Sequence, residues 1–551
     1  MKKFIVLLNV LFLAFLFIGC APSVEQDDII ILYTNDVHCG IEDGLGYASV
    51  SAYKKDMLLE TDNVTLVDCG DAIQGGVIGT LSKGEYLVDI MNQVGYELAV
   101  LGNHEFDYGM DQLQYLISKA KSKYLGCNIE YTGKNENKLS EIIPYQIITY
   151  DNIDVAYIGI TTPESVVKST PKYFMEDGEY VYGFTSDTKQ AFYSCIQKYI
   201  DEVMKAGADY VVALAHLGDT DESVPFTSVD VIQNTKGLDV VLDGHAHSVI
   251  ESKKVQDLDG KDVLLSSTGT RLANLGKLTI DVEGGISTEL IDSSEYSKKD
   301  EATAKYIEGI KENYEAEMAV VVGKSDVVLT GYTEDGIRLV RNRETNVGNF
   351  CADAYRAVAG TNIAFVNGGG IRADIEVGDI TYSNMISVNP FGNALCSLYA
   401  TGSEILDALE HSVRNVEEEH SKDGLAVGEN GGFLSVSGLK FSVDLSVESS
   451  VVLDGNGMFV EVSGERRVKD VYVLNENGEY VPLQEDKVYT LASHTYMLRN
   501  GGDGYTMFQD NELIIAEGIS DYQVLITYLK DYLNGVIDDK YQNIEGRITL
   551  E

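Results

Sequence analysis

Apolar runs alternate with polar, turn-forming stretches along the first half of the chain, and this pattern predicts strands that alternate with helices. Five apolar runs predict buried strands at residues 29–33, 64–67, 98–101, 210–215 and 239–242. Between several of them, residues 111–122 and 187–206 predict helices. An alternation of this kind is typical of a layered α/β domain, in which ligand sites form where loops leave the carboxyl ends of strands.

Each of the five predicted strands runs directly into residues that can bind a metal ion. The exits contain, in order, Asp36 and His38; Asp71; Asn103, His104 and Asp107; His216; and His245 and His247. Any single exit could be a helix cap or a structural turn, and Asp68 and Asp243 are open to the same interpretation. Five of the chain's eight histidines lie in these exits, however, and turns do not account for that concentration. The exits therefore predict a metal site.

The mixture of side chains narrows the choice of metal. Imidazoles combined with carboxylate and amide oxygens suit Zn, Mn, Fe or Co better than a Ca cage. Cys39 and Cys69 adjoin these residues and are alternative thiolate ligands, although the neighbouring Asp and His residues already suffice. There are too many ligands for one tetrahedral ion, whereas two ions about 3.5–4 Å apart that share a carboxylate fit the number and serve hydrolysis of phosphate esters.

The second half has signals of its own. Residues 296–319 are rich in Lys, Glu and Ala and predict an exposed helix, which separates two zones of different composition. Residues 346–359 predict an amphipathic helix and residues 361–366 a buried strand. That strand leads into a glycine-rich turn that ends at Arg372, where the backbone can approach a ligand closely and the guanidinium can meet an anion.

Composition adds limits on the partners. The chain has 551 residues, enough for two or three domains, and a formal net charge of −45. Such a charge repels nucleic acid polymers, so we expect none as a partner. A small anionic substrate would need dedicated arginines or bound metals.

The N-terminus predicts export. A basic start and an apolar run over residues 4–18 are typical of a signal peptide, and the run is too short to span a membrane. It ends in Phe17-Ile18-Gly19-Cys20, which resembles the lipobox of bacterial lipoproteins. We therefore expect a signal peptide over residues 1–20, lipid on Cys20, a tether over 21–27 and a membrane-anchored protein outside the cytoplasm. The alternative is an ordinary secreted protein cleaved nearby.

The five strand exits, in their order and spacing, resemble the motif set of calcineurin-like metallophosphoesterases. Phe106-Asp107 after Asn103-His104-Glu105 is similar to the 5'-nucleotidase and UDP-sugar hydrolase branch. The resemblance implies a β-sandwich flanked by helices over residues 28–292, a linker helix over 293–322, and a smaller α/β domain that grips the nucleotide over 323–551.

The same resemblance implies roles for the residues of the first half. One ion would be held by Asp36, His38 and His247, the other by Asn103, His216 and His245, and Asp71 would bridge both. His104, oriented by Asp107, would be the catalytic pair. The cofactors expected are thus two divalent ions, with Zn, Mn or Co favoured.

In the second half the resemblance implies substrate-binding residues. They are Arg341 and Arg372 for the phosphate, Phe391 and Tyr496 for the base, and Asn367, Asn393 and Asp503 for ribose and base. The second aromatic of the family falls on Met497, so either Tyr496 serves after a shift of one residue or Met497 packs on the base less selectively. A third arginine found in some members is replaced by Ile337, with Arg338 beside it.

The expected function is hydrolysis of nucleoside 5'-monophosphates to nucleoside and phosphate by a water activated by two metal ions. One alternative keeps the metal core but cleaves a UDP-sugar, a nucleoside 2',3'-cyclic phosphate or a sulfur ester. A second alternative is a solute-binding lipoprotein, which has two α/β halves and a hinge but no need of a metal cluster.

Overall fold

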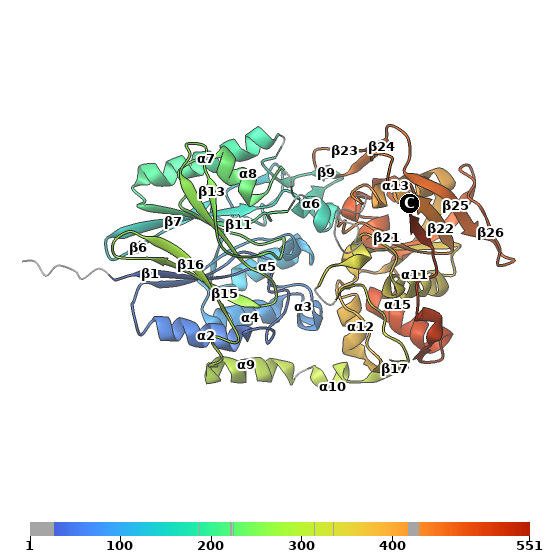
Figure 1. The fold of residues 1–551 in the computed structure, drawn as a ribbon, viewed down its shortest axis with the longest axis horizontal. Helices are drawn as coiled ribbons and strands as arrows, with labels where there is room; N and C mark the ends of the chain where they lie inside the picture. Colours follow the sequence, from blue (N-terminus) through green and yellow to red (C-terminus); the bar gives the residue numbers. More distant parts are fainter. Residues whose placement is uncertain are drawn as a thin grey trace, which may run out of the picture.

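The computed structural model describes residues 27–551, apart from 187, 221, 222, 224, 313, 334, 335 and 417–428. The expected signal peptide, Cys20 and nearly all of the tether lie outside the described residues. The chain forms two halves that lie side by side, and helices α9 and α10 run along one edge from the first to the second (Figure 1). In the described part of the chain, no helix is both long and apolar enough to cross a membrane.

Two six-stranded sheets form the N-terminal half, with strand orders β16-β15-β1-β2-β3-β4 and β13-β14-β12-β11-β7-β6. Their bounds are β1 (Ile29–Thr34), β2 (Val64–Asp68), β3 (Leu98–Val100), β4 (Lys123–Leu125), β15 (Asn274–Ile280) and β16 (Ile286–Asp292), then β6 (Tyr145–Tyr150), β7 (Ile153–Thr161), β11 (Tyr210–His216), β12 (Val240–Leu242), β13 (Val249–Gln256) and β14 (Asp262–Thr268). Ile31 and Val67 of the first sheet and Leu214 of the second share one buried cluster, so the sheets pack face to face.

Helices cover the outer faces of this sandwich (Figure 1). They are α2 (Gly46–Met57), α3 (Val77–Ser82), α4 (Glu85–Val94), α5 (Met110–Lys119), α6 (Ser165–Lys168), α7 (Lys189–Ala206) and α8 (Ser228–Asn234). Two short antiparallel strand pairs complete this half, β5 (Ile129–Tyr131) with β10 (Tyr182–Phe184) and β8 (Met175–Glu176) with β9 (Glu179–Tyr180). Apolar residues of α4 pack on the first sheet and those of α7 on the second. The expected sandwich flanked by helices is confirmed.

The connecting segment differs from the single exposed helix expected over 296–319. It forms α9 (Glu301–Lys311) and α10 (Glu315–Met318). Asp300 caps α9 by accepting a hydrogen bond from Thr303 N at 2.9 Å. Ile307 and Ile310 are buried against the N-terminal half, so α9 belongs to that half.

The C-terminal half is a smaller α/β unit, as expected. Its sheets have the orders β21-β18-β27-β20-β28, β26-β25-β22-β30 and β19-β17-β29, with a separate hairpin β23-β24. The strands are β17 (Val321–Ser325), β18 (Ile363–Asn367), β19 (Gly378–Thr381), β20 (Leu395–Thr401), β21 (Leu434–Ser437), β22 (Leu439–Val443), β23 (Val451–Leu453), β24 (Phe459–Val462), β25 (Val468–Leu474), β26 (Tyr480–Pro482), β27 (Val488–His494), β28 (Leu513–Ile515), β29 (Val536–Ile537) and β30 (Ile548–Leu550). The α-helices are α11 (Asn346–Ala359), α12 (Tyr382–Val388), α13 (Gly402–Ser412), α14 (Thr495–Leu498) and α15 (Asp521–Thr527).

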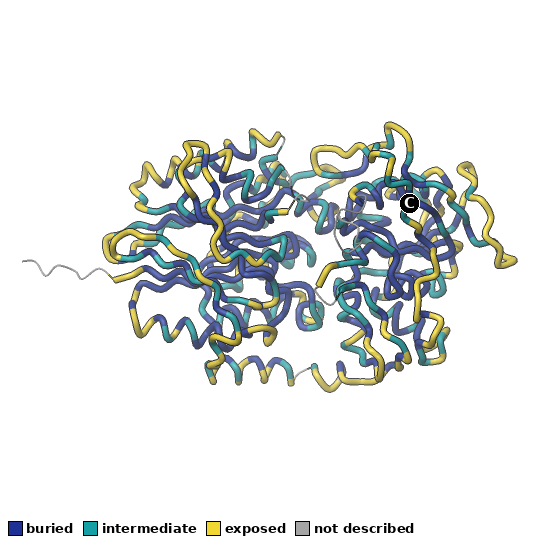
Figure 2. Tube along the Cα trace, viewed as in Figure 1, coloured by how far each residue is buried: buried dark blue, intermediate teal, exposed yellow. Residues whose placement is uncertain are grey.

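Each half has its own buried interior (Figure 2). Hydrogen bonds from side-chain hydroxyl groups join the halves directly. Tyr496 donates its hydroxyl to the Val167 carbonyl at 3.2 Å, and Thr80 donates to the Pro390 carbonyl. The structure therefore shows the halves in contact, with the candidate site between them.

Candidate active site

The five strand exits meet at one edge of the sandwich. Strands β1, β2 and β3 are parallel, as are β7, β11 and β12, so their carboxyl ends open toward the same side. The backbone there is strained, because five non-glycine residues of the exits have positive φ angles. They are Asp36 (50°), His38 (46°), Asp71 (59°), His245 (79°) and His247 (59°). Non-glycine residues rarely adopt this conformation, and strain of this kind concentrates at functional sites.

Three groups of side chains at this edge present ligand atoms within 4.8 Å of one another. The groups are Asp36, His38 and His247; His38, Asp71 and His104; and Asp71, His216 and His245. Asp71 and His38 are each shared between two groups, so the cluster is continuous. The structure thus brings together six of the seven residues expected as ligands, and Asn103 borders the same cavity.

The candidate ligand atoms of this cluster lie close to one another. His38 Nε2 lies 2.9 Å from His247 Nε2, His216 Nε2 lies 3.1 Å from Asp71 Oδ2, and His247 Nε2 lies 3.5 Å from Asp36 Oδ1. Asn103 Oδ1 is buried and finds no hydrogen-bond partner among the described residues. A buried amide oxygen without a donor is costly in a protein interior, and a cation would satisfy it. The donors present therefore fit a cluster of divalent ions.

Gly102 lets the loops come this close. A Cβ atom built on it would lie 2.1 Å from Asp71 Oδ1, so any side chain there would displace the shared carboxylate. A Cβ at Gly244 would lie 2.9 Å from His216 Nδ1 and 3.0 Å from Asp36 Oδ2. Both glycines are thus required by the packing of the ligand loops.

The charges of the cluster are strongly coupled. Burial raises the pKa of Asp36 to about 7, although His216 opposes this rise. Burial would raise the pKa of Asp71 as well, but the imidazoles of His216 and His104 hold it well below its usual value. Asp71 is therefore the anionic centre of the cluster and suits a position between two cations.

Buried carboxylates brace the ligand loops. Glu105 accepts hydrogen bonds from the backbone N–H of Gly102, Asp71 and Ala72 at 2.7, 2.8 and 2.9 Å. Asp243 accepts from Leu217 N at 3.0 Å. Asp243 thus braces the loop that follows β11, and its hydrogen bonds there neither cap a helix nor close its own turn.

Groups outside the cluster orient several of its histidine rings, and His38 Nδ1, for example, lies 2.9 Å from the Gln74 carbonyl. His216 Nδ1 lies 2.7 Å from the Cys69 carbonyl, and His245 Nε2 lies 2.8 Å from Glu164 Oε2. A partner on the far ring nitrogen fixes the tautomer that is available to a metal. Cys69 contributes its carbonyl, and among the residues described neither Cys39 nor Cys69 joins a ligand group.

His104 lies between the cluster and the cavity. It starts the short helix η1 (His104–Phe106) that follows β3, and its Nδ1 lies 2.6 Å from Asp107 Oδ2. Burial would lower the pKa of His104, but the carboxylates of Asp107 and Asp71 raise it above the usual value. The imidazole is thus set to carry a proton toward the cavity.

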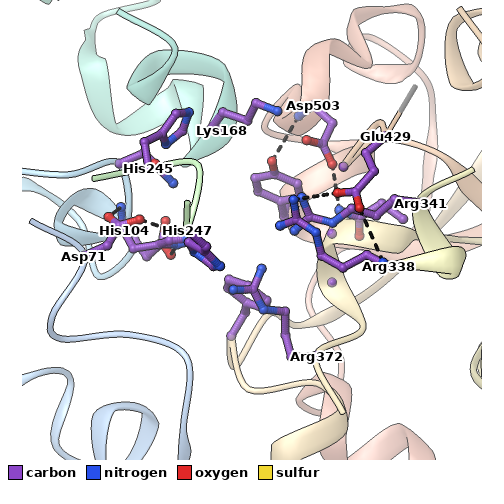
Figure 3. A pocket seen from close by; sticks show the side chains of 18 of the residues that line it. Asp71, His104, Lys168, His245, His247, Arg338, Arg341, Arg372, Glu429 and Asp503 are labelled. Carbon is purple, nitrogen blue, oxygen red and sulfur yellow. Dashed lines mark hydrogen bonds and ion pairs between the residues drawn. The ribbon is translucent and has the colours of Figure 1, made fainter. Parts of the chain in front are cut away.

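The opposite wall of the cavity comes from the C-terminal half. The cavity has a volume of about 580 Å³ (Figure 3). All the residues expected to bind substrate line it: Arg341, Asn367, Arg372, Phe391, Asn393, Tyr496 and Asp503. Arg372 lies with its Cζ 5.8 Å from the centre of the Phe391 ring, and that ring lies 5.9 Å from the ring of His104. An arginine and an aromatic face therefore adjoin His104.

The choice between Tyr496 and Met497 is decided by burial. Met497 is fully buried in the core of the C-terminal half, where Ser493 contacts its sulfur, while Tyr496 lines the cavity. The Tyr496 hydroxyl accepts a hydrogen bond from Asp503 N at 3.0 Å. Asp503 Oδ2 in turn accepts from Asn367 Nδ2 at 2.6 Å. The three polar groups form one fixed network.

Three polar residues of the site, Glu164, Lys168 and Glu429, were missed by sequence reasoning. Glu164 precedes helix α6 and Lys168 ends it, and Lys168 points into the cavity (Figure 3). Glu429 forms an ion pair with Arg338 at 2.5 Å on the cavity wall. These residues lie far in sequence from the motifs, and only the folded chain brings them to the site.

Comparisons with known proteins agree with this architecture. A family model for calcineurin-like phosphoesterases matches residues 29–249, and one for the 5'-nucleotidase C-terminal domain matches residues 321–510. A trifunctional nucleotide phosphoesterase of Bacillus subtilis is 26% identical over 571 residues, covering 96% of this chain but only 35% of that protein. Human 5'-nucleotidase is 28% identical over 579 residues, covering 96% of this chain and 92% of its own.

A solved structure gives the same result for the fold. The 5'-nucleotidase precursor of Thermus thermophilus superposes with a TM-score of 0.76 at 28% identity, covering 95% of this chain and 99% of its own. One family thus accounts for both halves of the chain and for the candidate metal site at the edge of the N-terminal half. The chain belongs to the metal-dependent phosphoester hydrolases that join a calcineurin-like phosphoesterase domain to a 5'-nucleotidase C-terminal domain.

Proposed function

We propose that the protein is a 5'-nucleotidase, which hydrolyses nucleoside 5'-monophosphates to nucleoside and phosphate. The single observation that carries this proposal is the two-sided cavity. One wall presents the ligand cluster and His104, and the other presents arginines beside an aromatic ring. Relatives named 5'-nucleotidase from human and Thermus thermophilus support the choice of substrate.

In this proposal the strand exits hold two divalent ions. Asp36, His38 and His247 would hold one, Asn103, His216 and His245 the other, and the shared Asp71 would bridge them. When bound, such a pair of ions supplies Lewis acidity and an activated water to phosphate-ester hydrolysis. Of the favoured metals, Zn, Mn and Co all accept this donor set.

The chain's own residues complete the chemistry. His104 faces the cavity with Nε2, because its Nδ1 is held by Asp107. From there it can donate a hydrogen bond to a phosphoryl or leaving oxygen, where negative charge develops in the transition state. Arg372 and Arg341 stand across the cavity, where planar guanidinium groups can orient a phosphate.

The nucleoside would be gripped by the C-terminal half. Phe391 and Tyr496 offer aromatic faces to the base, and stacking on such faces tolerates different bases. Asn367, Asn393 and Asp503 offer polar atoms to ribose and base. We further propose that the protein acts outside the cytoplasm and is anchored by lipid on Cys20, on the basis of the signal and lipobox pattern.

A substrate panel on the purified full chain tests this function. The panel comprises AMP and other 5'-monophosphates, 2',3'-cyclic AMP, UDP-glucose, a sulfur ester and p-nitrophenyl phosphate. We expect the 5'-monophosphates to have the highest kcat/KM, with modest differences between bases. Higher kcat/KM for a cyclic nucleotide, a sugar nucleotide or the sulfur ester would transfer the assignment to that substrate.

A further inference from the structure

The segment Asn389–Asn393, here called the base loop, carries Phe391 and Asn393 into the cavity but has no regular structure of its own. It follows helix α12 and precedes strand β20. A loop that presents an aromatic face must be held in place, because otherwise stacking would cost the entropy of ordering it. The contacts that hold it therefore bear on substrate selection.

The two ends of the base loop are held in different ways. At its start, Asn389 Nδ2 donates to the Gly370 carbonyl at 2.7 Å, which ties the loop to the turn that carries Arg372. At its end, the chain runs antiparallel to the segment before α15, since Leu395 N donates to the Ile519 carbonyl at 2.8 Å. Asp521 contacts the loop at Asn393 itself, one of its cavity-lining residues.

Asp521 is joined to Asn393 in both directions. Its carboxylate Oδ2 accepts from Asn393 N at 3.1 Å, and its own N donates to the Asn393 carbonyl at 2.8 Å. The Gly392 N–H also contacts this carboxylate. Two successive backbone N–H groups of the base loop, those of Gly392 and Asn393, thus contact the side chain of Asp521.

The side chain of Asp521 is only 2% exposed and does not line the cavity. Within the described part of the chain, its contacts are with backbone N–H groups, including Tyr522 N at 2.8 Å, and it takes part in no ion pair. A buried carboxylate without a cation is costly, and here its hydrogen bonds to the loop offset part of that cost. The hydrogen bonds to the base loop therefore explain why a carboxylate is buried at this position.

We propose that Asp521 is a positioning residue for the base loop and so sets the preference of the site for nucleotides over simple phosphate esters. This inference rests on the proposed 5'-nucleotidase function. Asp521 touches neither the cavity nor the ligand cluster, so it acts only through Phe391 and Asn393. Its loss should weaken binding of the nucleoside and leave the chemistry at His104 intact.

The charge state of Asp521 gives the proposal a pH signature. Burial raises the pKa of Asp521 to about 7, although the surrounding backbone N–H groups oppose the rise. Protonation replaces an acceptor with a hydroxyl where the Asn393 and Gly392 N–H groups point, so the loop loosens as the pH falls below about 7. At higher pH the carboxylate is charged and the loop is held.

Other titratable groups face Asp521 from the elements packed against it. Helix α11 faces it with Cys351 and Tyr355, whose pKa values burial raises, so both stay neutral. Helix α12 carries Tyr382, packed against Tyr522 at 5.8 Å between ring centres. Glu517, in the segment before α15, is paired with Arg499 at 2.8 Å.

The test compares Asp521→Asn with wild type on AMP and on p-nitrophenyl phosphate. The amide keeps the shape but turns a donor toward the loop N–H groups. We expect the KM for AMP to rise about tenfold, with kcat for AMP and both constants for the aryl phosphate within about twofold of wild type. Asp531→Asn, the same change at an exposed position, serves as the control.

Two further readouts separate positioning from mere folding. In wild type the KM for AMP should rise as the pH falls from 8 to 6, while the aryl phosphate shows no such rise; in Asp521→Asn the extra dependence should vanish. Calorimetric titration with adenosine should show weakened binding in the variant at unchanged melting temperature. Equal losses on both substrates, or an unchanged KM for AMP, would overturn the inference while leaving the function standing. Failure of wild type to cleave AMP or bind adenosine would overturn both.

Discussion

His104 and Asp107 form a close pair that borders the cavity, with 2.6 Å between Nδ1 and Oδ2. The carboxylate holds the ring so that Nε2 faces the space between the halves. We predict that His104→Ala lowers kcat by several orders of magnitude but retains the metal content of wild type, because it removes charge stabilisation and no principal ligand. Metal analysis after dialysis and kinetics on AMP check this.

Asp107→Asn refines the same prediction. The amide can still accept from Nδ1 but no longer stabilises a charged imidazole, so kcat should fall less than in His104→Ala. The activity should also fall on p-nitrophenyl phosphate, since both substrates share the catalytic pair. Loss of metal in either variant would show that His104 is a ligand and not the catalyst.

A second prediction concerns Asp71, the carboxylate shared by two ligand groups. Asp71→Asn should abolish activity and lower the metal content, because the anionic centre that both ions would share is gone. Chelation of wild type should likewise abolish activity and lower the melting temperature, since ions that bind only the folded state stabilise it. Readdition of Zn, Mn or Co singly, followed by activity and melting measurements, identifies the metal that restores both.

The sequence was informative about this site for a physical reason. Five apolar runs predict buried strands, and parallel strands bring their carboxyl ends together, so His38, Asp71 and His216 could be expected at one edge before any fold was known. Local patterns cannot place residues that meet through the packing of distant segments. Glu164, 81 residues before His245, shows this limit.

Two local predictions depended on information that the sequence lacks. The Lys- and Glu-rich stretch over 296–319 predicts one exposed helix, but Ile307 and Ile310 find an apolar surface on the N-terminal half and α9 packs there. The choice between Tyr496 and Met497 turned on which side chain points into the core, which spacing alone leaves open.

A third prediction concerns stability, at a buried network remote from the site. Asp353 accepts hydrogen bonds from Arg547 Nη1 and Nη2 at 2.9 and 3.0 Å, and from the Tyr541 hydroxyl at 2.9 Å. Arg547→Ala leaves this carboxylate buried without its main partner and should lower the free energy of unfolding by about 3–5 kcal/mol. Lys540→Ala, which removes a half-exposed partner, should cost about 1 kcal/mol or less. Urea unfolding measures both.

The same network predicts a pH dependence. Burial opposes ionisation of Asp353, but Arg547 outweighs it and lowers the pKa of the carboxyl from 3.8 to about 2. A depressed folded-state pKa contributes stability above the unfolded pKa of about 4, and this contribution is lost as the pH falls toward 2. The difference in unfolding free energy between wild type and Asp353→Asn should therefore be constant from pH 7 to 5 and shrink below pH 4. If this free-energy difference stays constant down to pH 2, the ionised Asp353 carboxylate does not contribute to stability.

A fourth prediction tests the proposed anchor. Cys20→Ser should move the protein from the membrane fraction to the soluble fraction, because lipid on a processed Cys20 is the proposed attachment and stable anchoring needs more than one acyl chain. Metabolic labelling with a fatty acid checks the modification itself, and Cys195→Ser, at a partly buried cysteine, is the control. Membrane association that survives the loss of Cys20 would point to another mode of attachment.

The last prediction separates two roles of the aromatic residues in the cavity. Phe391 touches the cavity with its ring alone, whereas Tyr496 also bonds the Val167 carbonyl of the other half through its hydroxyl at 3.2 Å. Phe391→Ala should raise the KM for AMP by the equivalent of about 1–2 kcal/mol of lost stacking and leave the aryl phosphate nearly unchanged.

Tyr496→Phe keeps the ring and removes only the hydroxyl, so stacking should survive. The contact between the halves is lost, however, and the Asp503 N–H loses its acceptor, so the closed arrangement becomes less stable. We therefore expect Tyr496→Phe to lower kcat/KM for both substrates by a similar factor, and Tyr496→Ala to add a further loss on AMP alone. If Tyr496→Phe affects only AMP, its hydroxyl serves substrate recognition; if Tyr496→Ala adds nothing on AMP, Phe391 binds the base without a second aromatic. Measuring kcat and KM of Phe391→Ala, Tyr496→Phe and Tyr496→Ala on AMP and on p-nitrophenyl phosphate decides between these roles. Loss of stacking changes the constants for AMP alone, whereas loss of the contact between the halves changes the constants for both substrates.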